Sequence, residues 1–316
     1  MDLGTTSLPA SLARALEPVL QKQCLDQLEP IRWFRTDWQR GGAATGFSTW
    51  THEDGRTEEV VVKFPVVLRE LRWTRRMQDC NGVVPKLFAS GVGLGGYDLA
   101  WIIIERIPYG PLGKHWDDNI IQRISGAAAA FTSAAREFPV DQRGRREDWS
   151  DLLAKAKKSI RTNKIDDLAK WKKMHKWFSK TLDDILDIWR ARHTRQWLHG
   201  DLHLANSMCR SEKSDAPVCL IDLAEVHAGH WVEDAIYLER QLWGHHSRLE
   251  SSNPLNTMAH ARKAIGLKVT DDYHELANIR RLLLAATAPA FMQSEGDPRY
   301  LHACLEQFHL AAEQLN

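Results

Sequence analysis

The sequence predicts an α+β chain of two lobes, a small β-rich lobe followed by a larger and mainly helical one. Strand-like runs separated by glycine turns and one helix fill residues 32 to about 105, and helical spacing dominates from residue 113 onward. The most polar motifs lie where short strand-like segments interrupt the helical spacing of the second lobe. We therefore place one lobe at residues 1–110, including a helical lead-in, and the other at residues 111–316.

The first lobe is predicted from hydrophobic spacing and turn chemistry. Residues 1 to about 32 carry apolar side chains on one helical face, and RWFRTDWQRGGAATGFSTWTHEDGRTEEVVVKF then reads as three strands. Asp54-Gly55 marks the hairpin between the second and third strands. Pro65 ends the third strand and a helix follows, and VVPKLFASGVGLGGYDLAWIIIERI adds two strands joined at Gly95-Gly96.

The second lobe is predicted from helical periodicity. Apolar residues recur at three- and four-residue steps between 120 and 138, residues 150 to 192 read as one or two helices, and helices resume near 232. Two short strand-like islands, QWLHGDLHLANSMCR and APVCLIDLAEV, interrupt this pattern.

Length and composition describe an ordinary globular chain. Its 316 residues suit two lobes that share a cleft, and 43% are hydrophobic and 26% charged. A net charge of +1 gives no reason to expect nucleic acid as a partner. The run LAWIIIERI is too short to span a bilayer, and five cysteines without a CxxC pattern fit a reducing, cytoplasmic location. The sequence leaves the oligomeric state open.

The motif His199-Gly200-Asp201-Leu202-His203-Leu204-Ala205-Asn206 has the chemistry that phosphoryl transfer requires. That reaction needs a carboxylate near the attacking hydroxyl and oxygen ligands for Mg²⁺. Asp201 and Asn206, five residues apart, can supply both, and their spacing is that of the His-x-Asp-x4-Asn loop of protein kinases. The alternative is a polar turn in which both side chains bond their own backbone.

Asp222 ends the apolar run Cys219-Leu220-Ile221, sixteen residues after Asn206. A hairpin between the two would return Asp222 to the side of Asn206 and complete a Mg²⁺ site of oxygen ligands. Alone, an aspartate in this position is usually a turn residue or a helix cap.

Lys63 and the glycines before it are candidate phosphate-binding groups. Lys63 ends a buried strand, where a lysine needs a partner, and Glu70 in the next helix can supply one. Alternatively, Lys63 emerges at the strand end and Glu70 faces solvent.

Gly41 and Gly42, in the segment GGAATG, would let backbone N–H groups approach phosphates, although a hairpin turn explains them equally well.

Together these segments resemble the aminoglycoside phosphotransferase family of the protein-kinase-like superfamily. The resemblance covers roughly residues 35 to 245, through RGGAATGF, VVKF, LREL, VVPKLFASG, WIIIERIPYGPL, HGDLHLAN, LIDLAEV and GHWVEDAIYLE in that order. It implies a protein-kinase-like bilobal fold whose N-terminal lobe binds ATP. The chain lacks an APE-like segment after Asp222, which argues against a protein kinase.

The resemblance also implies a role for each matching residue. Asp201 would be the catalytic base, Asn206 and Asp222 the Mg²⁺ ligands, and Lys63, held by Glu70, the cation on the ATP phosphates. Glu105 and Ile107 would contact adenine through their backbone groups, and Asp234 would be structural. Leu204 departs from the proline that the family often has, and the glycine loop is loosely matched.

The phosphate acceptor is expected to be a hydroxylated small molecule. An aminoglycoside-type antibiotic competes with a metabolic sugar or amino alcohol, and a catalytically silent nucleotide-binding module or a helical interaction scaffold is the alternative to an enzyme. Aminoglycosides are polycations and need acidic pockets, whereas residues 150–180 are strongly basic. The alternative explanation of this basic segment is a solvated helix face. The candidate acidic groups elsewhere in the chain are Asp117, Asp118, Asp183, Asp184, Glu225, Glu233 and Glu239.

Overall fold

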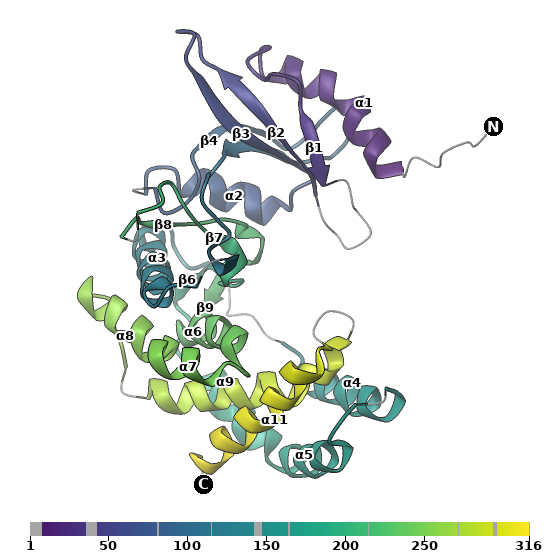
Figure 1. The fold of residues 1–316 in the computed structure, drawn as a ribbon, viewed down its shortest axis with the longest axis vertical. Helices are drawn as coiled ribbons and strands as arrows, with labels where there is room; N and C mark the ends of the chain where they lie inside the picture. Colours follow the sequence, from purple (N-terminus) through teal and green to yellow (C-terminus); the bar gives the residue numbers. More distant parts are fainter. Residues whose placement is uncertain are drawn as a thin grey trace, which may run out of the picture. The chain divides into compact units, whose positions relative to one another are not determined.

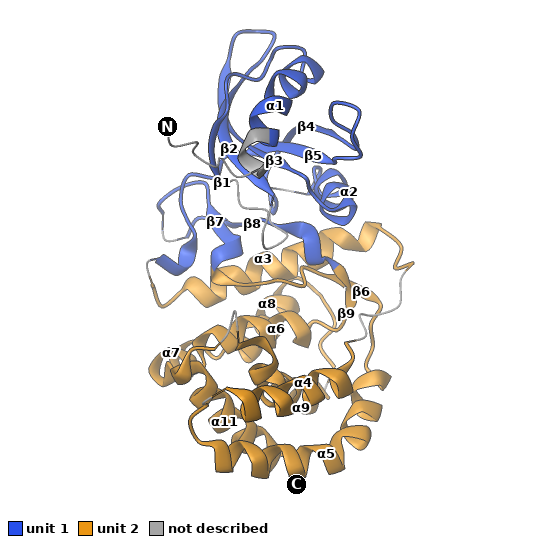
Figure 2. Cartoon of the chain, turned by 90° about the vertical axis from the view of Figure 1, so that its right-hand side faces the viewer, with its two compact units in different colours: residues 1–114, 205–226 blue, residues 115–204, 227–316 orange. Residues whose placement is uncertain are grey.

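A computed structural model describes residues 8–35, 43–80, 82–114, 116–141, 147–163, 165–213, 215–270, 272–292 and 296–315. The chain divides into two compact units (Figure 2). The first comprises residues 1–114 and 205–226, and the second comprises residues 115–204 and 227–316. The first unit therefore ends four residues beyond the lobe boundary expected at 110, and it also takes in the segment 205–226, which the sequence places in the helical lobe.

The first unit is built on an antiparallel sheet, of which β1 to β4 are labelled in Figure 1. Its five strands lie in the order β1-β2-β3-β5-β4. Its strands are β1 (Arg32–Arg35), β2 (Ala44–Thr51), β3 (Thr57–Phe64), β4 (Leu87–Gly91) and β5 (Trp101–Glu105). All five lie within the strand-like runs predicted from the sequence. Residues 95 and 96 turn between β4 and β5 with positive φ values of 61° and 84°, which suits the glycines found there.

Two helices cover the two faces of this sheet. Helix α1 (Leu8–Gln23) packs Leu16 and Leu20 against Val62 and Phe64 in one apolar core. Helix α2 (Leu68–Arg76) packs on the other face, where Leu71 contacts the core around Ile102. Side chains alternate across a strand, so Lys63, between Val62 and Phe64, points toward the α2 face.

A hairpin completes the first unit. Strand β7 (Ser207–Cys209) pairs antiparallel with β8 (Val218–Leu220), and the short 3₁₀ turns η3 (Leu204–Asn206) and η4 (Leu223–Glu225) flank it. The 3₁₀ turn η1 (Leu112–Lys114) ends the N-terminal part of the unit. The hairpin is the one expected between Asn206 and Asp222.

The second unit is mainly helical (Figure 2). Its longer helices are α3 (Ile120–Ala134), α4 (Trp149–Thr162), α5 (Leu168–Ala191), α8 (Pro254–Ala264), α9 (Tyr273–Thr287) and α11 (Pro298–Glu313). Shorter elements are η2 (Ala135–Glu137), α6 (Val232–Glu239), η5 (Arg240–Leu242), α7 (His246–Ser252) and η6 (Ala288–Phe291). Helix α9 lies at the centre, where it packs against α4, α5, α6 and α11.

Two short strands in this unit position the predicted catalytic loop. Strand β6 (Gln196–Leu198) pairs antiparallel with β9 (His227–Gly229), so that Leu198 lies opposite His227. The predicted catalytic loop begins at His199, directly after β6, and the N–H groups of His199 and Gly200 donate to Asp234 in the first turn of α6.

Within the described ranges, no helix combines the length and the apolar character needed to cross a membrane.

Candidate active site

Lys63 and Glu70 form the ion pair predicted from the sequence. Lys63 Nζ lies 2.7 Å from Glu70 Oε1 and 3.3 Å from Asp222 Oδ1. Glu70 stands in the first turn of α2 and is only 4% exposed, so the ammonium supplies the partner that a buried carboxylate requires. Burial opposes the charge of Lys63, but the two carboxylates outweigh it and raise the pKa of Lys63.

The hairpin brings Asn206 and Asp222 to its open end. Ser207 lies opposite Leu220, and Ile221 N–H donates to the Asn206 carbonyl oxygen at 3.0 Å. Asp222 adopts a left-handed backbone with φ 64° and ψ 71°, a conformation that aspartate tolerates better than most residues. The hairpin register therefore accounts for the return of Asp222 to Asn206 that the sequence predicts.

The side-chain oxygen atoms at this end of the hairpin suit a magnesium ion. The side chain of Asp222 is 41% exposed, and Lys63 engages only one of its two carboxylate oxygens. Over the residues that the structure describes, no group of three or more His, Cys, Asp or Glu side chains could hold a metal by itself. Magnesium bound through one or two protein oxygens and substrate phosphates does not need such a group.

Ile107 offers unused backbone hydrogen-bonding groups just beyond β5. The residue is 5% exposed, yet no hydrogen bond joins its N–H or C=O to another described residue. Buried backbone groups are nearly always paired, so this segment is suited to the polar edge of a ligand. Glu105, two residues earlier, binds Lys86 through both its N–H and its carboxylate. Gly41 and Gly42 lie outside the described residues.

The loop that carries Asp201 belongs to the second unit, where α6 and η5 hold its backbone. His199 N–H and Gly200 N–H donate to the two carboxylate oxygens of Asp234 at 3.0 and 2.9 Å. Asp234 is 4% exposed, and burial raises its pKa. At the other end of the loop, Leu204 N–H donates to Gln241 Oε1 at 3.0 Å. Asp234 thus has the structural contacts that the resemblance implies.

The Asp201 carboxylate is held ionised by its neighbours. His203 Nε2 lies 3.4 Å from Asp201 Oδ2. Burial raises the pKa of Asp201, but the hydrogen bonds from His203 and Tyr237 and the nearby imidazoles outweigh it and lower the value to about 2. Neither His203 nor Tyr237 is among the site residues predicted from the sequence, because neither role follows from local spacing.

A buried charge network lies beside this loop. Glu233, adjacent to Asp234, accepts from Arg192 Nε at 3.0 Å and from His230 N–H at 2.7 Å, and His227 Nε2 lies 3.5 Å away. Burial disfavours its charge, yet His227 and Arg192 together keep the pKa of Glu233 below the ordinary range. The network joins the end of α5 to β9 and to the start of α6.

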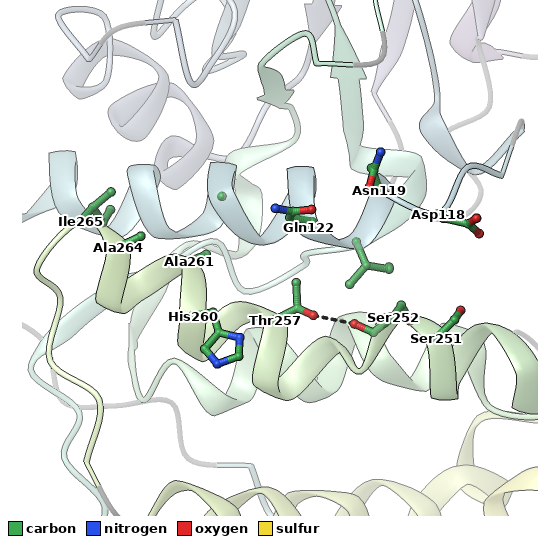
Figure 3. Close-up of a pocket in the computed structure, with 12 residues that line it drawn as sticks. Asp118, Asn119, Gln122, Ser251, Ser252, Thr257, His260, Ala261, Ala264 and Ile265 are labelled. Atoms are coloured by element: carbon green, nitrogen blue, oxygen red, sulfur yellow. Dashed lines mark hydrogen bonds between the residues drawn. The ribbon is translucent and has the colours of Figure 1, made fainter.

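A pocket of about 650 Å³ lies between α3 and the α7–α8 segment of the second unit (Figure 3). Its polar lining includes Asp118, Asn119, Gln122, Ser252 and His260, and Figure 3 shows Thr257 hydrogen-bonded to Ser252. The described residues that line it include no lysine, no arginine and none of the residues predicted as catalytic, nucleotide-binding or metal-binding.

A protein-family model described as the phosphotransferase enzyme family matches residues 38–277. No curated protein matches the chain. A mutant aminoglycoside 2′-phosphotransferase-IIIa in complex with GDP is similar in structure, with a TM-score of 0.59 and 12% identity over 96% of this chain and 97% of that one.

Two further solved structures are similar. An aminoglycoside phosphotransferase from Alicyclobacillus acidocaldarius has a TM-score of 0.55 and 15% identity, over 99% of this chain and 96% of that one. Choline kinase from Cryptosporidium parvum has a TM-score of 0.56 and 10% identity, over 96% and 94%. At these identities the likeness concerns the fold, and it confirms the protein-kinase-like α+β fold predicted from the sequence.

Proposed function

Because the chain belongs to the phosphotransferase enzyme family, we propose that it moves the γ-phosphate of ATP to a hydroxyl group of a small molecule, with Asp201 as the catalytic base. The observation that carries this proposal is the position of the Lys63 ammonium between the carboxylates of Glu70 and Asp222. An ammonium fixed in this way is a point charge suited to phosphate oxygens, and the adjacent carboxylate is suited to a metal ion on the same phosphates.

The first unit supplies the groups for the nucleotide. Ile107 N–H and Glu105 C=O would bind the edge of adenine, and Lys63 would bind the phosphates. Asn206 and Asp222 would hold Mg²⁺, which when bound neutralises charge on the phosphate oxygens. These assignments are supported by the backbone of buried Ile107, which no hydrogen bond joins to another described residue, and by the hairpin that brings Asn206 and Asp222 together.

The second unit supplies the group for the acceptor. The Asp201 carboxylate would accept a hydrogen bond from the acceptor hydroxyl and take its proton as the new oxygen–phosphorus bond forms. The bond from the γ-phosphorus to its bridging oxygen breaks in the same step, and ADP leaves with the electron pair. A carboxylate with a pKa of about 2 is a weak base, so its main contribution is to orient the hydroxyl, with proton transfer occurring late.

The acceptor is proposed to be a hydroxylated molecule of low positive charge. Helices α4 and α5 carry a run of lysines of which Lys155 and Lys170 pair with aspartates, while Lys158, Lys172 and Lys176 make no ion pair in the described part of the chain. This basic run gives no support to a polycationic acceptor such as an aminoglycoside, which needs an acidic site. A sugar or amino alcohol therefore fits better, and an aminoglycoside-type antibiotic is the competing acceptor.

A phosphate-transfer screen tests the proposal. Purified protein is incubated with Mg·ATP and with panels of sugars, amino alcohols and aminoglycosides, and both ADP and the phosphorylated product are measured. We expect acceptor-dependent ADP release with at least one panel. Tight Mg·ATP binding without turnover in any panel, and without slow ATP hydrolysis, would instead support a silent nucleotide-binding module.

A further inference from the structure

Arg210, at the end of β7, joins three segments of the first unit through its side chain. Its Nε lies 2.7 Å from Glu105 Oε1 and its Nη2 lies 2.8 Å from Glu105 Oε2, a two-pronged contact with one carboxylate. Nη1 donates to the Gly82 carbonyl at 2.6 Å, and Nη2 also donates to the Val84 carbonyl at 3.1 Å. One guanidinium therefore fixes the end of β5 and the segment before β4 to the hairpin.

Backbone hydrogen bonds dock the same hairpin on the same two segments. Leu220 N–H donates to the Val83 carbonyl at 2.7 Å. Cys209 and Tyr109 exchange two hydrogen bonds at 2.7 and 3.1 Å. These contacts explain why residues 205–226 belong to the first unit rather than to the helical one.

Arg210 connects the two segments that are proposed to bind opposite ends of the nucleotide. Glu105 begins the segment that would bind adenine, and the hairpin ends at Asn206 and Asp222, which would bind Mg²⁺ on the phosphates. A planar guanidinium with two parallel hydrogen bonds to one carboxylate fixes distance and angle together, which a lysine ammonium cannot do. The Arg210 side chain is 37% exposed, so its ion pair adds little stability in water, and its geometry matters more than its charge.

We propose that Arg210 is a positioning residue that sets the spacing between the adenine-binding segment and the metal-binding end of the hairpin, so that one nucleotide engages both ends at once. This inference rests on the proposed function of the first unit. A ligand that binds two linked subsites gains affinity because its second contact is intramolecular, and that gain depends on the spacing of the subsites. Loss of Arg210 reduces this gain in affinity for the whole nucleotide. The adenine-binding segment still binds adenosine, and the metal-binding end of the hairpin still binds Mg·tripolyphosphate.

The test compares whole nucleotide with its fragments. Dissociation constants for Mg·ATP, adenosine and Mg·tripolyphosphate are measured by calorimetry on the full chain, for the wild type and Arg210→Met. We expect the dissociation constant for Mg·ATP to rise about tenfold, while those for adenosine and tripolyphosphate change less than about twofold. Arg210→Lys, which keeps the charge and the stem, should behave like Arg210→Met.

Arg75→Met is the matched control. Arg75 also joins two segments of the first unit, since its Nε and Nη2 donate to Ser90 Oγ and to the Ser90 carbonyl at 2.9 and 3.2 Å. Among the described residues, no hydrogen bond or ion pair joins Arg75 to the hairpin. Its substitution should leave all three dissociation constants unchanged.

The outcomes separate this inference from the proposed function. Wild-type affinity for Mg·ATP in both Arg210 variants, or an equal loss for Mg·ATP and for both fragments, would overturn the positioning role while the function stands. A wild-type protein that binds no Mg·ATP would overturn the proposed function itself. If Arg210→Met does not fold, Arg210→Lys alone decides between these results.

Discussion

The ammonium of Lys63 lies 2.7 Å from the Oε1 of Glu70, a carboxylate that is 4% exposed and belongs to the next helix along the chain. The pair crosses from β3 to α2, on the face of the sheet opposite α1. Because Asp222 lies 3.3 Å from the same ammonium, the pair also fixes the end of the β7–β8 hairpin.

Lys63→Met should raise the KM for ATP by about ten- to a hundredfold, because a hydrogen bond to a charged group contributes about 1.5–3 kcal/mol. Steady-state kinetics with varied ATP measures this effect, and circular dichroism checks that the fold survives the loss of Glu70's partner. Lys86→Met is the control, since Lys86 pairs with Glu58 at 2.9 Å on an exposed surface. Unchanged KM and kcat for ATP in Lys63→Met would assign Lys63 to a purely structural ion pair.

Asp222→Asn should weaken the dependence on magnesium specifically. The substitution keeps the size of the side chain but removes the charge of the proposed Mg²⁺ ligand, so the Mg²⁺ concentration for half-maximal activity should rise about tenfold or more. The affinity for adenosine, which has no phosphates, should stay the same. A magnesium titration that superimposes on that of the wild type would remove Asp222 from the metal site.

The elements that could be predicted from the sequence are those with local signals. Asp54-Gly55 and the alternating runs beside it specify the β2–β3 hairpin, and the apolar run ending at Asp222 specifies β8. The pairing of Lys63 with Glu70 was predictable because a lysine on a buried strand needs a partner nearby in the chain.

The contacts that could not be predicted join residues far apart in the chain. Arg210 reaches Glu105 across 105 positions, and nothing in the sequence around either residue indicates that contact. Residues 205–226 were expected in the helical lobe, but they group with the sheet through side-chain and backbone contacts of this kind. The placement of His203 and Tyr237 around Asp201 likewise depends on where α6 begins, which no local pattern fixes.

His203→Leu should raise the pKa of Asp201. In the wild type, burial raises this pKa but hydrogen bonds from His203 and Tyr237 lower it to about 2, against an ordinary value of 3.8. Removal of His203 leaves the effect of burial less opposed, so protonation of Asp201 and the acid loss of kcat should both move to higher pH. Carboxyl ¹³C NMR of labelled aspartate and the pH profile of kcat measure these shifts. Coincident pH profiles for variant and wild type would contradict the role assigned to His203.

Arg192→Met should destabilise the second unit strongly. Arg192 is the cation 3.0 Å from buried Glu233, and a buried carboxylate that loses its cation typically costs about 3–5 kcal/mol of unfolding free energy. The folded pKa of Glu233 lies below its ordinary 4.5, so the stabilisation is present above about pH 4.5 and is lost as pH falls through the folded value.

Urea denaturation at neutral and acidic pH measures this loss. Arg190→Met is the matched control, because Arg190 pairs with Asp187 at 3.5 Å on an exposed helix face, and its unfolding midpoint should barely change. Equal midpoints for the two variants at neutral pH would show that the Glu233 network does not stabilise the unit.

The turnover of Asp201→Asn with the acceptor found in the transfer screen tests the proposed mechanism most directly. Asparagine keeps the size and some of the hydrogen bonding but removes the charge and the proton acceptor. We predict that kcat falls by about a hundredfold or more, the scale of lost general-base help, while the dissociation constant for Mg·ATP stays within about twofold of the wild type. A variant that keeps near wild-type turnover with that acceptor would contradict the assignment of Asp201 as the catalytic base.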